Sequence, residues 1–223
     1  MGKAIEQIAH NRGHETVAFD VHDKLERLGS DHFDVAIEFT TPEGSPGNIK
    51  VCLDHRIPVV CGTTGWLSKK DEVNEYCRLK TGTFFYASNY SIGVNIFFKV
   101  NAYLARLMDN QNYQASIHEI HHTQKKDSPS GTAITIAEGI ISNNSGYHAW
   151  SEGIAGDQII PVSAERIDPY PGTHTVKYDC DVDMIEMTHT AKSRTGFALG
   201  AVLVAEWIPG KQGVLSMDDF LPF

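Results

Sequence analysis

Asp34-Val-Ala-Ile-Glu-Phe-Thr-Thr-Pro-Glu-Gly44 is the stretch that decides the fold. Its first six residues, mostly apolar, predict a short strand over 34–39. Its last five residues are typical of turns and predict a loop that leads into a helix. Because the first half of the chain alternates helical and strand patterns in this way, we expect a parallel sheet wrapped by helices.

The same pattern of a strand followed by a small polar loop recurs downstream. Residues 57–61 predict a strand before Gly62-Thr-Thr-Gly65, and residues 83–88 predict another before Asn89-Tyr-Ser91. In doubly wound sheets the loops at the carboxyl ends of the strands form the ligand crevice. These loops are therefore expected to bind a ligand.

Upstream of the opening stretch, residues 2–11 predict a helix whose inward residues include Ile5, and residues 16–20 predict a short strand that ends at Asp20. A dinucleotide-binding fold begins with a strand and a Gly-x-Gly-x-x-Gly turn. This chain opens at Met1-Gly-Lys3, which corresponds only to the end of that turn. We expect that the sequence starts at an internal methionine, and that a native start at this point would make cofactor binding poor.

The second half of the chain has a different pattern. Residues 96–108 place apolar side chains at helical spacing and predict a helix packed in the core. Four later segments alternate apolar and polar residues, which predicts a half-exposed, mostly antiparallel sheet. They are residues 116–120, 158–163, 173–178 and 183–189. Residues 197–207 predict an apolar helix that packs back on the first unit.

These patterns predict an α/β chain of two domains joined by two crossings that form a hinge. The first is a Rossmann-like doubly wound parallel sheet without its first strand, made of residues 1–91 and 194–223. The second is an α+β domain for substrate binding and oligomerisation, made of residues 92–193.

Composition narrows the class of protein. The chain has 223 residues and a net charge of −9, and its Lys and Arg residues never form more than a pair, which argues against a nucleic-acid partner. Its 4 cysteines lack a Cys-x-x-Cys spacing, which favours reduced thiols in the cytoplasm. The sequence shows neither a leader pattern nor an apolar run of about 18 residues, so we expect no membrane association.

Glu119-Ile-His-His-Thr-Gln-Lys-Lys-Asp-Ser-Pro-Ser-Gly-Thr-Ala133 is the densest polar stretch. Pro129 and Ser130 precede an apolar run of helical period, so Gly131 and Thr132 fall in a helix first turn, a place that binds anions. A cationic loop before such a turn, with histidines that titrate near neutrality, suits the binding and chemistry of a small carboxylate. The alternative interpretation is a solvated charged loop before an ordinary helix.

The polar stretch and five further ordered motifs resemble one family, from Gly2 to the C-terminus. The polar stretch resembles the signature of the 4-hydroxy-tetrahydrodipicolinate reductase (dihydrodipicolinate reductase) family. The others are Phe39-Thr-Thr-Pro-Glu-Gly44 with Gly62-Thr-Thr-Gly65, Ala87-Ser-Asn-Tyr-Ser-Ile-Gly-Val-Asn95, Pro171-Gly-Thr-His174 and Ala191-Lys-Ser-Arg-Thr-Gly-Phe-Ala198. The resemblance implies reduction of 4-hydroxy-tetrahydrodipicolinate to tetrahydrodipicolinate with release of water, in the diaminopimelate route to lysine.

The resemblance also implies roles for individual residues. His121 would donate a proton as hydride arrives, and Lys125 would stabilise or relay the charge, which agrees with the ordinary chemistry of these groups. The substrate carboxylates would be held by His122, Ser130, Gly131 and Thr132, with further charge from Arg194.

The cofactor implied by the resemblance is NADH, NADPH or both. Asp20 would bond the adenosine ribose, and Met1 and Gly2 are what is left of the glycine turn. No arginine follows Asp20 directly, although Lys24 is close, so we lean towards NADH or dual use. The nicotinamide half would be contacted by Gly62, Thr63, Thr64, Ala87, Ser88, Asn89 and Tyr90.

Two other functions compete with the reductase. One is a metal-dependent hydrolase that uses His118, His121 and His122 as ligands, but successive side chains of a strand point to opposite faces, and we expect no metal site. The other is a non-enzymatic relic that binds dicarboxylates without a dinucleotide. Apolar pairs such as Met184-Ile185 on the second sheet suggest a covered surface, and the family implies a homotetramer built through that sheet.

Overall fold

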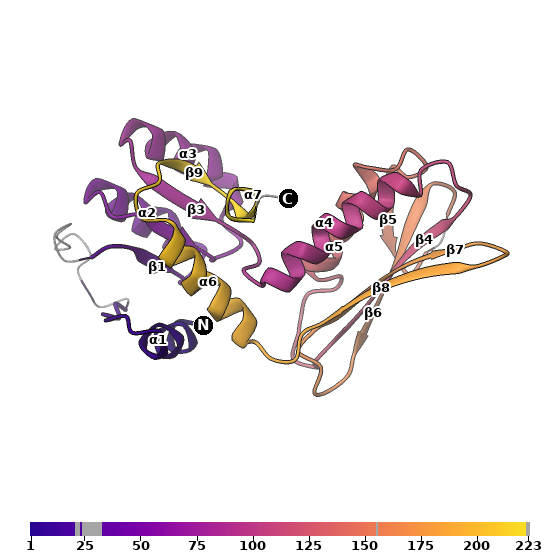
Figure 1. The fold of residues 1–223 in the computed structure, drawn as a ribbon, viewed down its shortest axis with the longest axis horizontal. Helices are drawn as coiled ribbons and strands as arrows, with labels where there is room; N and C mark the ends of the chain where they lie inside the picture. The colour runs from indigo at the N-terminus through magenta and orange to yellow at the C-terminus, as the bar shows by residue number, and fades with distance from the viewer. Residues whose placement is uncertain (21–22, 24–32, 155, 222–223) are drawn as a thin grey trace. The chain divides into compact units, whose positions relative to one another are not determined.

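The computed structural model describes residues 1–20, 23, 33–154 and 156–221. The chain forms two compact units, one of Met1–Ser91 with Thr195–Phe223 and one of Ile92–Arg194 (Figure 1). Each unit has its own sheet and its own buried core. We describe them separately.

The sheet of the first unit is parallel throughout. Its strands run in the order β1 (Ala36–Glu38), β2 (Val59–Cys61), β3 (Thr83–Tyr86) and β9 (Gly213–Leu215). The three strands expected from residues 34–39, 57–61 and 83–88 are confirmed in shorter form, whereas β9 is an apolar triplet too short to be found from its pattern.

Helices cover both faces of this sheet. Val60 and Phe85 pack against α1 (Gly2–Asn11) and α6 (Thr195–Trp207), which contact each other. Val59 and Phe84 point the opposite way, into a second core that includes buried residues of α2 (Ser45–Asp54) and α3 (Lys70–Leu79). This alternation follows from the period of two along a strand, and it confirms the doubly wound arrangement. The 3-10 helix η3 (Leu67–Lys69) and the short α7 (Met217–Phe220) complete the unit.

The prediction of a strand at residues 16–20 is wrong. Residues 14–20 lie in neither a helix nor a strand, and Val17 and Phe19 are 63% and 41% exposed. A strand is stabilised by hydrogen bonds to a neighbouring strand. Among the residues that the structure describes, none offers this segment such a partner, so its apolar alternation is left unburied.

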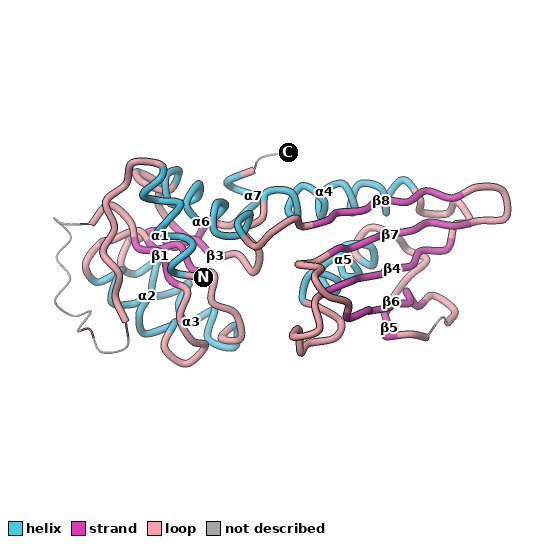
Figure 2. The backbone as a smooth tube through the Cα atoms, turned by 90° about the horizontal axis from the view of Figure 1, so that it is seen from below, coloured by secondary structure: helices cyan, strands magenta, loops and turns pink. Residues whose placement is uncertain are grey.

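The second unit is a mixed sheet of five strands, drawn side by side in Figure 2. Their order is β5 (Ala149–Glu152), β6 (Ile159–Arg166), β4 (Gln114–His121), β7 (Thr173–Asp179) and β8 (Met184–Thr190). Pairs β4–β7 and β7–β8 are antiparallel, but β4–β6 and β5–β6 are parallel, where the sequence predicted mostly antiparallel pairing. The parallel pairing of β4 with β6 is made possible by the long crossover through α5 (Gly131–Ile141).

Helix α4 (Ile92–Leu107) packs beside α5, and both contribute to the core of the second unit. The prediction that the whole apolar stripe of α4 is buried is wrong. Phe97 is buried, but Val100, Tyr103 and Leu107 are 46%, 55% and 53% exposed. Helical spacing shows that the side chains share a face, and it does not show what covers that face.

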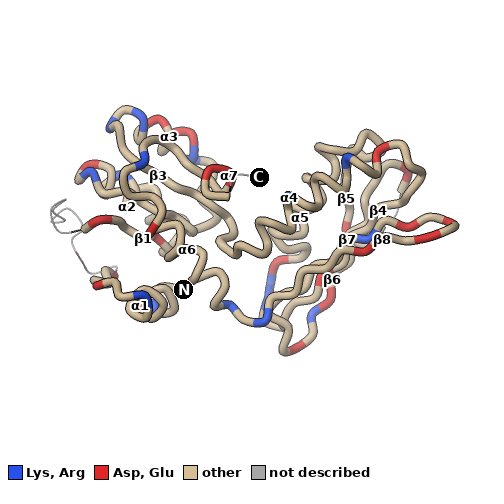
Figure 3. Tube along the Cα trace, viewed as in Figure 1, with Lys and Arg blue, Asp and Glu red and all other residues tan. Residues whose placement is uncertain are grey.

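Lys and Arg are spread over several elements of both units, while acidic residues gather at the turn between β7 and β8 (Figure 3). Within the described part of the chain, no helix is long and apolar enough to span a bilayer.

Candidate active site

Strand β4 carries the buried polar residues of the second unit. Its residues alternate, so that Ala115, Ile117, Glu119 and His121 point to the same, buried face. Ala115 and Ile117 belong to the apolar core of the unit. The buried face of β4 therefore carries apolar core residues at one end and polar residues at the other. Glu119 and His121 are packed as core residues are, which restricts their movement.

Two imidazoles meet beside the Glu119 carboxylate. His121 Nε2 lies 3.2 Å from His174 Nε2, and each of these atoms lies 3.5 Å from Glu119 Oε2. The close approach of the chain at Gly172 encloses the His121 ring, because a Cβ at Gly172 would be 2.8 Å from His121 Cε1. We call Glu119, His121 and His174 the imidazole–carboxylate cluster.

Hydrogen bonds keep the carboxylate of this cluster ionised. Burial alone would raise the pKa of Glu119, but contacts with His121, His174 and the Ser130 amide lower it well below its ordinary value. Arg166 Nη2 also donates to Glu119 Oε1 at 3.1 Å. Burial lowers the pKa of His174, which favours its neutral form. The cluster therefore holds a fixed negative charge against His121.

Sequence analysis found His121 but missed Arg166 and His174, and it gave Glu119 no role. His174 stands in one of the quoted motifs, and it lies directly opposite Glu119 in the pairing of β4 with β7. Arg166 lies opposite His121 in the pairing of β4 with β6. Both contacts are set by strand register, which no local pattern reveals.

The helix start predicted at Gly131 and Thr132 is confirmed. Ser130 is the N-cap residue, and its hydroxyl accepts from the Ala133 amide at 3.1 Å. Gly131 is the first residue of the helix, is exposed and has open space where a Cβ would be. Thr132 follows it and is half-buried. The positive end of the helix dipole thus lies at an accessible position.

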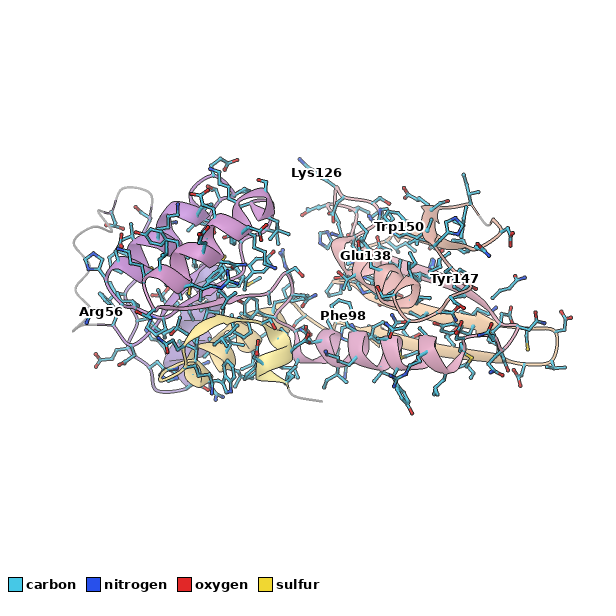
Figure 4. The ribbon with its side chains drawn as sticks, turned by 90° about the horizontal axis from the view of Figure 1, so that it is seen from above. Arg56, Phe98, Lys126, Glu138, Tyr147 and Trp150 are labelled. Carbon is cyan, nitrogen blue, oxygen red and sulfur yellow. The ribbon has the colours of Figure 1, made fainter. Side chains whose placement is uncertain are left out.

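The loop between β4 and α5 holds the other predicted groups. Lys125 Nζ lies 2.7 Å from both carboxylate oxygens of Asp127, and the Lys125 side chain is 20% exposed. His122 is half-buried and does not join the cluster, as expected for the next residue along. Lys126 extends away from the loop (Figure 4). Arg194, the last residue of this unit, is exposed, and none of the contacts among the described residues links it to the cluster.

The alternative set of three histidine ligands does not form. His118 points to the opposite face of the sheet, where it contacts Ser163 at 2.8 Å and Glu165 at 3.4 Å. Glu119, His121 and His174 do bring potential ligand atoms within 4.8 Å of one another. The Arg166 guanidinium at 3.1 Å disfavours a second cation there, so we interpret these residues as a hydrogen-bonded cluster.

In the first unit, the loops after β1, β2 and β3 are tied together. The Gly62 amide donates to Glu38 O at 3.0 Å, and the Thr40 amide donates to the Thr63 hydroxyl at 2.8 Å. Gly62 must be glycine, because a Cβ would lie 2.2 Å from the Phe39 ring. These contacts bring two of the predicted cofactor loops to one edge of the sheet.

The third loop joins them through Tyr90. Its hydroxyl donates to Cys61 O at 2.7 Å, and burial raises the pKa of this phenol well above its ordinary value. Ala87 is buried beside it, whereas Ser88 is exposed, and Asn89 Oδ1 accepts from the Ser91 amide at 2.9 Å. Tyr90 thus acts as a structural support of the loops.

The buried Glu38 is a feature of this edge that sequence analysis missed. It accepts from the Ser45 hydroxyl at 2.7 Å and from the Cys61 thiol at 3.0 Å, and it also bonds Thr40. Burial and the nearby Glu38 charge raise the pKa of Cys61 to about 12, which keeps this thiol protonated. Glu38 therefore fixes the loop that follows β1.

The remaining cofactor residues lie near the start of the chain. Met1 is the N-cap of α1 and Gly2 its first residue, where an added Cβ would meet no atom within 4 Å. Asp20 is exposed, its amide donates to Asp23 at 2.6 Å, and it does not end a strand. Thr64 is exposed after Thr63. Lys24 lies outside the described residues.

Known proteins resemble the chain along its whole length. Family profiles described as dihydrodipicolinate reductase match it at residues 1–90 for the N-terminus and 93–221 for the C-terminus. It is 48% identical over 224 residues to 4-hydroxy-tetrahydrodipicolinate reductase of Christiangramia forsetii, covering 99% of this chain and 93% of that one. The enzyme of the same name from Methanococcoides burtonii is 36% identical over 99% of this chain and 85% of its own length.

A solved structure shares the fold. Dipicolinate-bound dihydrodipicolinate reductase from Paenisporosarcina sp. TG-14 superposes with a TM-score of 0.69 at 21% identity. The match covers 84% of this chain and 73% of that chain.

Proposed function

This chain belongs to the dihydrodipicolinate reductase family, and from that premise we propose how its own residues carry out the family reaction. It is an oxidoreductase that reduces 4-hydroxy-tetrahydrodipicolinate to tetrahydrodipicolinate with release of water, in lysine biosynthesis by way of diaminopimelate. The overall reaction consumes one reduced nicotinamide dinucleotide and one proton for each water released.

The imidazole–carboxylate cluster is the single observation that carries the proposed mechanism. His121 donates the proton, because both imidazoles of the cluster lie 3.5 Å from the ionised Glu119 and burial favours the neutral form of His174. Lys125 stabilises the negative charge that develops on the substrate, and its pairing with Asp127 keeps the ammonium in place until substrate binds.

The first turn of α5 binds a substrate carboxylate. Ser130 shapes the turn, and Gly131 and Thr132 present the backbone to the anion. His122 also holds a substrate carboxylate, and Arg194 adds positive charge. The relative from Paenisporosarcina, whose structure holds dipicolinate, supports a planar dicarboxylate ligand for this site.

The first unit binds the dinucleotide, which supplies the hydride when bound. Its residues fit that group, because the open space around Gly2 allows close approach to the positive end of α1. Asp20 binds the ribose, and the loops with Gly62, Thr63 and Thr64 and with Ala87 to Tyr90 hold the nicotinamide half. We propose NADH, or dual use of NADH and NADPH, since a carboxylate at Asp20 repels a 2′-phosphate.

We also propose a cytoplasmic homotetramer assembled through the second sheet, without membrane or nucleic-acid partners. Val182, Met184 and Ile185 at the β8 end of this sheet are 87%, 50% and 39% exposed, an apolar surface suited to a second copy. Light scattering at micromolar concentration should give a tetrameric mass. A monomeric mass would contradict the assembly.

Calorimetry separates the reductase from the relic. The protein is titrated in turn with NADH, with NADPH and with dipicolinate. The reductase predicts binding of a dinucleotide and of the dicarboxylate, and weaker dipicolinate binding for Thr132→Val. Binding of dipicolinate without either dinucleotide would support the relic and contradict the proposed function.

A further inference from the structure

Glu119 is a buried carboxylate to which the proposed mechanism gives no step of its own. Its side chain is 0% exposed, and it follows Ile117 on the core-facing side of β4. A carboxylate without water contact costs free energy unless it is paired and hydrogen-bonded. The partners of Glu119 therefore indicate why an acid occupies this place.

The Glu119 carboxylate contacts several parts of the site. Both of its oxygens accept from the Ser130 amide, Oε1 at 3.1 Å and Oε2 at 3.3 Å, and Ser130 is the N-cap of α5. Oε2 lies 3.5 Å from Nε2 of His121 and the same distance from Nε2 of His174. One side chain thus contacts both the proton donor and the N-cap of the carboxylate-binding helix.

Arg166 extends this connection to the catalytic loop. Its Nη2 donates to Glu119 Oε1 at 3.1 Å and to the Asp127 carbonyl at 2.6 Å, and Asp127 pairs with Lys125. The contacts come from β4, β6 and β7, whose register places Arg166 beside His121 and His174 beside Glu119. Side chains held by three paired strands have little freedom to move.

Charged and titratable groups surround His121 on three strands. Glu119 faces it from its own strand and His174 faces it from β7, while Arg166 of β6 lies opposite it in the strand pairing and bonds Glu119. Lys125 acts on His174 from farther away, and His174 acts on His189. Glu119 is ionised, because hydrogen bonds lower its pKa against the effect of burial. Burial lowers the pKa of His174. His121 Nε2 lies 3.5 Å from this ionised carboxylate.

We propose that Glu119 is a positioning residue of the reductase: it holds His121 in its proton-donating state and orientation, and it fixes the first turn of α5 through Ser130. His174 is the neutral partner against which the His121 ring is oriented. This inference rests on the assignment of His121 as the proton donor.

Glu119→Gln tests the charge while keeping an oxygen that accepts from Ser130. We expect kcat to fall by roughly 10²-fold and the alkaline limb of its pH profile to move to lower pH by about one unit, with KM changed less than about threefold. Glu119→Ala removes the acceptor as well, so its KM should also rise. The matched control is Glu165→Gln, whose carboxylate faces His118 at 3.4 Å on the exposed face of the sheet, and it should behave as wild type.

A folded Glu119→Gln variant with wild-type kcat and pH profile would overturn the proposal. So would a loss of kcat with an unshifted pH profile, since that is what a purely structural residue gives. If circular dichroism shows that the variant does not fold, imidazole ¹⁵N shifts of the wild-type protein decide instead. A cationic His121 beside a neutral His174 at neutral pH supports the proposal, and two neutral rings overturn it. Absence of wild-type turnover would refute the proposed function, but the imidazole ¹⁵N shifts would still test the effect of Glu119 on His121.

Discussion

Gly172→Ala should disable the enzyme through the His121 ring. The alanine Cβ would lie 2.8 Å from Cε1 and 3.2 Å from Nδ1 of His121. Carbon atoms in contact are separated by about 3.5–4.0 Å, so the ring must move by roughly 0.7–1.2 Å. Such a shift breaks the alignment of His121 with His174, whose Nε2 atoms are 3.2 Å apart.

The expected effect is larger on kcat than on stability. A misplacement of about 1 Å at a reacting group costs roughly 10²-fold in rate, whereas one extra methyl group in a packed site costs about 1–3 kcal/mol of unfolding free energy. We would measure kcat from the absorbance of the reduced nicotinamide, and the unfolding free energy from urea denaturation. KM for the substrate should change little, because the first turn of α5 is untouched.

The control is Gly47→Ala in helix α2, where an added Cβ meets no atom within 4 Å. It should leave kcat unchanged and stabilise the first unit by up to about 1 kcal/mol. A wild-type kcat in Gly172→Ala would contradict the proposed role of His121, since it would mean that the position of the His121 ring does not matter for the reaction.

Three further predictions concern single contacts. Lys125→Met should lower kcat by roughly 10²-fold in steady-state assays. The control is Lys177→Met, which breaks a similar pair with a carboxylate two residues further along and should leave kcat unchanged. Equal kcat values for the two variants would refute the role of Lys125. Ser130→Ala should cost about 1 kcal/mol of unfolding free energy in urea and raise KM for the substrate, and an unchanged KM would contradict the binding turn. The hydrogen bond from Arg12 lowers the pKa of Glu206 from 4.5 to about 2, so its stabilisation is present above pH 4.5 and is lost as pH falls towards 2. Glu206→Gln should therefore lower the unfolding free energy by less than about 1 kcal/mol at neutral pH and by less still near pH 2. If urea denaturation gives the same difference in unfolding free energy between wild type and variant at both pH values, this prediction is wrong.

Local patterns predicted the parts of the fold that depend on local chemistry. The apolar runs before Gly62 and before Asn89 became parallel strands, and the apolar run after Ser130 became α5. Each of these segments combines a clear hydrophobic period with a turn or cap residue, so period and boundary agree. The strand expected at residues 16–20 had the period but lacks a described neighbour to pair with.

Long-range contacts account for what the sequence did not show. Glu119, Arg166 and His174 meet because three strands pair in one register. The Glu119–Arg166 and His121–His174 contacts join residues that are 47 and 53 positions apart in the chain. Likewise, the exposed face of α4 has the same spacing as a buried face. Register and burial depend on tertiary partners, which a single sequence read by local pattern does not specify.

We propose that this chain reduces 4-hydroxy-tetrahydrodipicolinate with His121 as the proton donor. The most direct measurement is the oxidation of NADH or NADPH by the purified protein in the presence of enzymatically generated substrate, for wild type and His121→Ala. We expect turnover by the wild type, and a kcat lower by roughly 10²–10⁴-fold in the variant. Turnover by His121→Ala at the wild-type rate, or none by a folded wild type that binds both dinucleotide and dipicolinate, would contradict it.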